Sequence, residues 1–212
     1  MLREWIGRAL GGARTTSEPA VDTRIIDGIP VGVINTREDV DTARVFRRAE
    51  SVIRRIAEYQ PWRLAHLRRD VAGILVERYP CRAAYLPDRR LCLLELTFMA
   101  NEQFSDSQVA ASLVHEGMHA RLDRLSAKYG VTPFSAARAR HERICRRAEL
   151  DWGLAVPDGE PVVRRAIESM QLADEDVAPT IEWGEAARRM AAVDRAQTSG
   201  SPRPDDLQSP GR

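Results

Sequence analysis

Apolar residues recur every three or four positions between residues 36 and 59, the spacing that gathers them on one face of a helix. The members of this stripe are Val40, Ala43, Val45, Phe46, Ala49, Val52, Ile53 and Ile56. Thr36, with Asp39 three positions later, is typical of a helix N-cap, and Pro61 marks the end of the helix. We therefore predict an amphipathic helix over residues 36–59, with a short strand before it at residues 29–34.

Between residues 71 and 98 the apolar positions fall instead into short runs that proline and aspartate separate. The runs at 71–76, 83–86 and 91–98 have the length and composition of strands, although the first could also end a helix. The turn Pro87-Asp88 lies between the last two runs and predicts a hairpin. We expect these strands to form a small, mostly antiparallel sheet.

Helical patterns return after residue 105. Ser105 and Gln108 form a capping-box sequence and Gly130 provides a C-terminal stop, so a helix is predicted between them. Thr132-Pro133 is typical of the start of a new helix. The further predicted helices cover about residues 132–154, 161–171 and 180–195. A helix, a small sheet and then several further helices indicate an α+β fold.

The length of 212 residues is enough for one domain with a sizeable core. We predict a flexible leader at residues 1–23, a single domain at 24–196 and a disordered tail at 197–212, where small and polar residues dominate. No apolar run approaches the roughly 18 residues that a membrane span needs, and the first residues lack the apolar core of a signal peptide. We therefore expect a cytoplasmic protein without a membrane span.

Charge and cysteine content narrow the possible partners. The 32 basic and 31 acidic residues give a formal net charge of +1, which does not favour a polyanionic partner. All basic residues except Lys128 are arginines, which can bind phosphate, but acidic residues are interleaved with them and a compositional bias explains the excess better. Cys81, Cys92 and Cys145 are an odd number without a CxxC pair, which fits a reducing compartment, although Cys81 and Cys92 could pair across the hairpin.

The candidate chemistry is concentrated in the HExxH sequence of residues 115–119, inside the helix predicted after Ser105. His115 and His119 are four positions apart, so their imidazoles project from one helix face and can share a tetrahedral Zn²⁺. Zinc lowers the pKa of a bound water to about 7, and Glu116 can accept a proton from this water as it attacks a carbonyl. We predict zinc as the cofactor, His115 and His119 as ligands, and Glu116 as the general base.

A third ligand is expected from the helix that follows. Glu142 and Glu149 are seven positions apart, which is two helical turns, so they share one face of that helix. His141 and Cys145 are also chemically able to bind zinc. The acidic residues could instead pair with neighbouring arginines on an exposed face.

The segment Leu113–Ala120, followed by a helix that carries Glu142, resembles the zincin metallopeptidases, and among them the gluzincins and small intracellular bacterial members. The resemblance covers about residues 71–155. It implies that the two motif histidines and a glutamate of the following helix hold zinc, that Glu116 is the general base, and that the substrate is a peptide or protein.

The third ligand departs from the pattern of that family. Many gluzincins have ExxxD at this ligand, with an aspartate four positions after the glutamate. In this chain the residue four positions after Glu142 is Arg146, and the residue four positions after Glu149 is Gly153. The choice between the two glutamates therefore stays open, and we favour Glu142 with Glu149 as the alternative. No histidine follows His119 at the short spacing of the metzincins, which disfavours that branch.

The resemblance also implies that a strand beside the active helix binds the substrate backbone by strand addition. Leu91–Phe98 would be this strand, unless it is an interior core strand. Asp123, four positions after His119, could orient a zinc ligand or pair with neighbouring arginines. Candidates for stabilising an oxyanion are Tyr85, Tyr129, His141 and nearby arginines, whereas His66 is interpreted as a structural or surface residue.

Three functional hypotheses follow from these residues. The leading one is a zinc metallopeptidase, a hydrolase that cleaves peptide bonds. The alternative is a non-catalytic binding or regulatory protein that keeps a zincin fold. A nucleic-acid binder is the third, and the balanced charge argues against it.

Overall fold

The structure, a computed structural model, describes residues 20–130, 138–179 and 182–199. The chain divides into two compact units, of which one ends at Thr180 and the other begins at Ile181. The first unit contains the sheet and most of the helices, and the second contains helix α9 (Trp183–Ser199). The predicted domain of residues 24–196 spans both units. Most of the predicted leader and tail lies outside the described residues.

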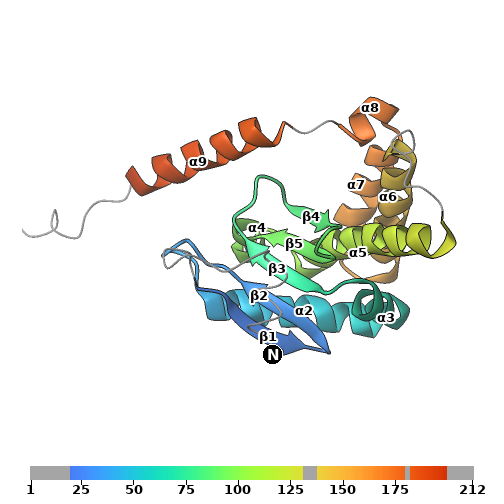
Figure 1. The fold of residues 1–212 in the computed structure, drawn as a ribbon, viewed down its shortest axis with the longest axis horizontal. Helices are drawn as coiled ribbons and strands as arrows, with labels where there is room; N and C mark the ends of the chain where they lie inside the picture. Colours follow the sequence, from blue (N-terminus) through green and yellow to red (C-terminus); the bar gives the residue numbers. More distant parts are fainter. Residues whose placement is uncertain (1–19, 131–137, 180–181, 200–212) are drawn as a thin grey trace, which may run out of the picture. The chain divides into compact units, whose positions relative to one another are not determined.

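The first unit contains a five-stranded sheet in the order β1-β2-β3-β5-β4 (Figure 1). The outer pairs β1/β2 and β4/β5 are antiparallel, whereas β2/β3 and β3/β5 are parallel. The strands are β1 (Asp22–Ile26), β2 (Ile29–Val33), β3 (Gly73–Glu77), β4 (Ala83–Leu86) and β5 (Leu91–Glu95). The α+β class is confirmed, but the sheet is mixed and the prediction of a mostly antiparallel sheet is wrong.

The parallel pairing of β2 with β3 follows from the two helices between them, because a long crossover returns the chain in the same direction. Helix α2 (Thr42–Tyr59) begins later than predicted, at a cap formed by Asp41, whose carboxylate accepts from the backbone of Ala43 and Arg44. Helix α3 (Pro61–Asp70) was not predicted. Pro61 ends one helix and also starts the next, since proline is tolerated in a first helical turn.

The strand predicted over residues 91–98 is shorter in the structure. Strand β5 ends at Glu95, and its carboxylate accepts from the backbone N–H of Phe98, so that it caps the short helix α4 (Leu96–Ala100). The predicted hairpin with β4 is confirmed by the antiparallel register of Leu86 with Leu91.

Helix α5 (Asp106–Tyr129) is bounded as predicted. The side chain of Ser105 accepts from Gln108, the Gln108 side chain accepts from the Ser105 backbone, and Gly130 ends the helix with φ +64°. Helices α6 (Arg138–Ala155), α7 (Glu160–Met170) and α8 (Asp174–Val177) follow. The predicted helix start at Thr132-Pro133 lies outside the described residues.

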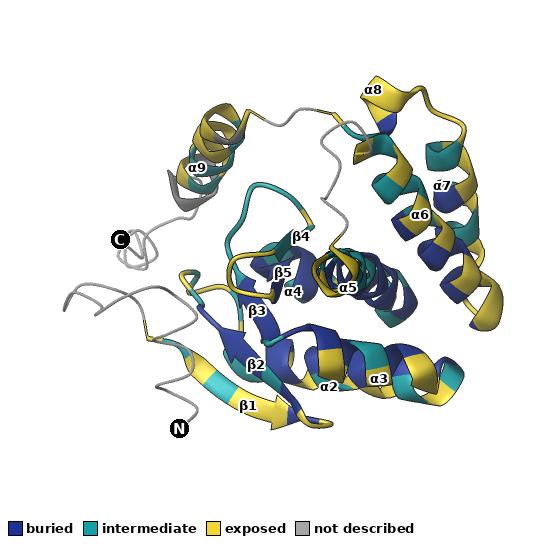
Figure 2. Cartoon of the chain, turned by 45° about the vertical axis from the view of Figure 1, so that its right-hand side comes forward, coloured by how far each residue is buried: buried dark blue, intermediate teal, exposed yellow. Residues whose placement is uncertain are grey.

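The core lies between one face of the sheet and the helices, with buried positions along β2, β3 and the inner sides of α2 and α5 (Figure 2). Helix α6 is fixed against α5 by Trp152, which is fully buried and donates from Nε1 to the carbonyl of Ser107 at 2.9 Å. Gly159 lets α7 approach α6, because a Cβ there would lie 1.9 Å from the carbonyl oxygen of Gly153. No helix in the described ranges is long and apolar enough to cross a membrane.

A buried carboxylate joins α3 to the second half of α5. Asp70 is 1% exposed and accepts from Arg124 at 2.9 Å and from Arg69 at 2.7 Å. Burial raises the pKa of Asp70, but the hydrogen bonds from the two arginines outweigh this effect, so the pKa lies below its usual value. The ionised carboxylate therefore stabilises the folded state.

We predict that Asp70→Asn lowers the free energy of unfolding at pH 7 by about 1.5 kcal/mol, because it removes charged hydrogen bonds. Because the pKa of Asp70 is lower in the folded state than in the unfolded state, its carboxylate stabilises the fold fully only above the unfolded pKa of about 3.9. This stabilisation is lost as the pH falls through the folded-state pKa. The difference between variant and wild type should therefore shrink below about pH 4. Urea unfolding of the metal-free chain at several pH values measures this difference in unfolding free energy.

The exposed pair Glu160–Arg164 on α7 provides the control. Glu160→Gln should change the unfolding free energy little at any pH, because exposed ion pairs contribute little. A loss in Asp70→Asn that stays constant down to pH 3 would contradict the role assigned to the carboxylate.

Candidate metal and active site

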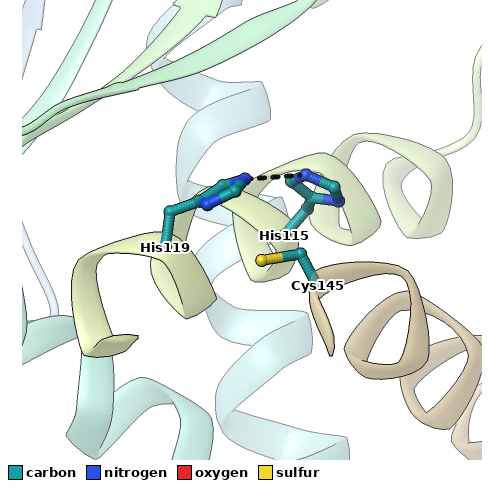
Figure 3. A group of neighbouring side chains, drawn as sticks. All are labelled: His115, His119 and Cys145. Carbon is teal, nitrogen blue, oxygen red and sulfur yellow. Dashed lines mark hydrogen bonds between the residues drawn. The ribbon is translucent and has the colours of Figure 1, made fainter. Parts of the chain in front are cut away.

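Helix α5 presents His115 and His119 on one face, as their spacing predicts. Their Nε2 atoms lie 3.1 Å apart, and Figure 3 shows the two rings turned toward each other. The His115 residue is 6% exposed, and the His119 side chain is 22% exposed. The imidazoles are therefore close enough to share one ion, and in a metal-free site they can share one hydrogen bond.

Glu142 of α6 faces both imidazoles. Its Oε2 lies 3.3 Å from Nε2 of His115, and its Oε1 lies 3.4 Å from Nε2 of His119. Two ligands at about 2.0–2.1 Å from a tetrahedral zinc are separated by about 3.3–3.4 Å. The two nitrogens and the carboxylate are thus spaced as zinc ligands are, and their chemistry suits this ion. Burial raises the pKa of Glu142, but hydrogen bonds from the histidines hold it well below its usual range.

Glu149 lies on the other side of His115. Its Oε1 is 2.7 Å from Nδ1 of the ring, which is ion-pair distance, although the alignment is poor for a hydrogen bond. Burial raises the pKa of Glu149, but His115 and then the neighbouring arginines lower it below its usual value. The two glutamates share a face of α6, as predicted, but they contact different nitrogens of the same imidazole.

Cys145 lies one helical turn after Glu142 and points toward the histidine pair (Figure 3). Its sulfur and one nitrogen of each ring lie within 4.8 Å of one another, so the thiol is a second candidate for the third ligand. Burial, followed by the field of Glu142, raises its pKa far above the usual value for a thiol. Among the described residues, no hydrogen bond or ion pair joins His141 to the pair. Cys81 and Cys92 are free thiols, and Cys92 lies opposite Tyr85 in the hairpin, so no bridge joins them.

Glu116 is 8% exposed and, with His115, lines a cavity of about 370 Å³. Burial raises the pKa of its carboxyl above the usual value, and His115 and His119 offset part of this effect. A carboxyl group with a raised pKa can both accept and return a proton near neutral pH. The cavity is lined by Cys81, Arg82, Ala83, Ser112, His115, Glu116, Arg146, Glu149, Arg165 and Ser169.

Other predicted residues lie around this centre. Asp123 accepts from the hydroxyl of Tyr85 at 3.2 Å, and this contact joins α5 to β4. Burial, followed by the charge of Asp123, raises the pKa of Tyr85. Tyr129 is 66% exposed at the end of α5, with Lys128 over its ring. Burial lowers the pKa of His66, which lies on α3.

The strand predicted to bind substrate is in the wrong position for that role. Strand β5 lies between β3 and β4 and pairs with both, so neither of its edges is free for strand addition. Strand β4 is the edge strand, it contacts α5, and its Ala83 lines the cavity beside Glu116. The nearly continuous apolar run of β5 is typical of an interior strand, so the pattern already contained this signal.

Comparison with known proteins finds no family model, no curated protein and no solved structure that matches the chain. The chemistry of the site therefore follows from its own residues.

We predict that His115 in the metal-free chain titrates with a pKa of about 9. Burial alone would lower this pKa, but Glu142 and Glu149 favour the imidazolium and raise it. Glu149→Gln removes one of these carboxylates and should lower the pKa. Histidine ring resonances followed by NMR during a pH titration measure it, and His66, with its pKa below 6.5, is an internal reference. A His115 pKa near 6.5 in the wild type would refute the assigned contacts.

Proposed function

We propose that the protein is a zinc metallopeptidase, in which His115, His119 and Glu142 hold the ion. The observation that supports this most is the spacing of the two imidazole nitrogens and the carboxylate, 3.1–3.4 Å apart. Bound there, zinc would supply Lewis acidity toward a peptide carbonyl and lower the pKa of an attacking water. The resemblance of the HExxH helix to zincin peptidases supports the same reaction.

Glu116 is the group that moves the proton. It follows the first histidine of the motif, and it lines the cavity of about 370 Å³ that His115 also lines. Its carboxylate accepts a proton from the attacking water and returns it to the leaving amine. Burial raises the pKa of this carboxyl, so its protonated form is favoured over the ionised form more than it is in water. This shift supports both transfers.

Glu149 is a positioning residue. A histidine that binds zinc through Nε2 donates from Nδ1, and a carboxylate at that nitrogen fixes the ring and the tautomer. The 2.7 Å approach of Glu149 to Nδ1 of His115 supports this role. Arg146 holds the same Oε1 atom at 2.7 Å, so the carboxylate is itself fixed in place.

The edge strand β4 provides the surface for the substrate backbone. One side of β4 pairs with β5, and its other side has no strand partner in the described sheet. An extended peptide could add there by main-chain hydrogen bonds, and Ala83 would bring it beside Glu116.

We predict that Glu116→Gln retains zinc but lowers kcat for peptide cleavage by about 100-fold or more, because an amide cannot accept the proton. A library of internally quenched peptides measures cleavage, and elemental analysis measures zinc. If wild type binds zinc but cleaves no peptide, the chain is a non-catalytic binding protein instead. Unchanged cleavage in Glu116→Gln would exclude the proposed proton transfer.

For the third ligand we predict that Glu142→Ala loses bound zinc, as His115→Ala does, whereas Cys145→Ala keeps it. Glu149→Gln should weaken zinc affinity by about 10–100-fold, the usual effect of a group that orients a ligand. Competition with a chromophoric chelator measures these affinities. Asp151→Ala, on the exposed side of α6, is the matched control and should retain wild-type affinity. Zinc loss in Cys145→Ala but not in Glu142→Ala would assign the thiol instead.

A further inference from the structure

The cavity beside Glu116 has an unusual share of positive charge. Arg82 reaches it from the segment before β4, Arg146 from α6 and Arg165 from α7. Two hydroxyl groups, of Ser112 and Ser169, complete its polar lining. Three guanidinium groups from three separate segments thus meet at the place where a substrate would lie.

The carboxylates of the cavity do not balance these charges. Among the described residues, the carboxylates that line it are Glu116 and Glu149, against three guanidinium groups. Glu149 already faces Arg146 at 2.7 Å and Arg165 at 3.5 Å. Oε1 of Glu149 accepts from Arg146, whereas its Oε2 has no hydrogen-bond partner among the described residues, so this carboxylate accepts one hydrogen bond from the ten N–H donors of the two guanidinium groups.

A buried donor is left over in this arrangement. Nε of Arg146 is buried and has no hydrogen-bond partner among the described residues. An unpaired buried donor costs free energy, and an incoming acceptor would recover it. The cavity therefore contains at least one donor that its own carboxylates do not satisfy.

The arginines also interact unfavourably with one another. Burial lowers the pKa of Arg165, Glu149 offsets part of this effect, and Arg146 and Arg82 lower it further by repulsion. Arg82 is held near the others by stacking over the ring of Phe104, 4.7 Å from its centre. An anion bound between these groups would relieve the repulsion, because opposite charges attract strongly in a partly desolvated site.

We propose that Arg82, Arg146 and Arg165 form an anion-binding subsite that receives a carboxylate of the peptide substrate next to the bond that is cleaved. This inference rests on the proposed function and names its substrate class. Guanidinium groups bind carboxylates through paired hydrogen bonds, and the cavity volume of about 370 Å³ can hold an amino-acid side chain. The carboxylate belongs either to an acidic side chain or to the C-terminus of the peptide.

Matched peptide hydroxamates test this subsite on the zinc-loaded full chain. The hydroxamate anchors each probe on the metal, and three probes differ only in one group: Glu with a C-terminal amide, Gln with a C-terminal amide, and Gln with a free C-terminal carboxylate. Calorimetric titration should give a Kd about tenfold lower for one of the two anionic probes than for the neutral probe, equivalent to one charged hydrogen-bond pair. The probe with the lower Kd identifies the source of the carboxylate.

Two adjacent arginines on α7 provide the variant and its control. Arg165→Gln should reduce the tenfold preference to about twofold or less, because Arg165 lines the cavity. Arg164→Gln should keep the full preference, because Arg164 is exposed and pairs with Glu160. Arg82→Gln is a second test that leaves the partners of Glu149 in place.

The outcomes separate the two proposals. Equal binding of all three probes by zinc-loaded wild type overturns the subsite and leaves the peptidase proposal intact. A preference that Arg165→Gln and Arg82→Gln both retain also overturns it. A preference for an anionic probe in a chain that cleaves no peptide supports the subsite and contradicts the proposed peptidase activity. A wild-type chain that binds no zinc contradicts both, since the metal is the anchor that each assumes.

Discussion

Charge buried between α5 and α6 is the constraint on which the rest of the structure depends. His115, Glu116 and Glu149 are all under a tenth exposed, and ionised groups are stable at such depth only when partners compensate them. His115 finds its partners across the helix pair, where Glu142 and Glu149 flank its imidazole, and Glu149 is also paired with Arg146 of its own helix. A shift of α6 along α5 by a fraction of a turn would leave several charges unpaired at once, so the register of these helices is narrowly defined.

The remaining elements maintain this register. The hydrogen bond from Trp152 to the backbone of Ser107 ties the C-terminal part of α6 to the start of α5. The close approach of Gly159 to Gly153 brings α7 near α6, and Arg165 of α7 reaches Glu149. At the other end of α5, Asp70 connects it to α3. The sheet contacts α5 through β4 and β5. Contacts outside the site, both polar and apolar, therefore help to hold the two helices where the buried charged groups meet.

Some features that depend on residues close together in the sequence were predicted correctly. The capping box at Ser105 and the stop at Gly130 gave both ends of α5, and the i, i+4 spacing gave the facing histidines. The hairpin of β1 and β2 was missed, although Asp27-Gly28, both with positive φ, is a strong two-residue turn signal. The sheet order could not be predicted, because which strand lies at an edge depends on long-range pairing. The same holds for the partners of Glu142 and Glu149: their shared face follows from spacing, but the nitrogen that each one meets depends on how α6 lies across α5.

Glu149 contacts both the histidine pair and the arginines of the cavity. On one side it faces Nδ1 of His115, and on the other it accepts from Arg146 and lies near Arg165 in the cavity. If a substrate carboxylate binds the arginines, it competes with Glu149 for their donors, and Glu149 then interacts more strongly with the imidazole. A carboxylate that interacts more strongly with Nδ1 makes Nε2 a better metal ligand. Under the proposed function, occupation of the cavity would therefore be coupled to the histidine pair through one buried side chain, Glu149, and would link the recognition of an anionic substrate to the chemistry at the ion.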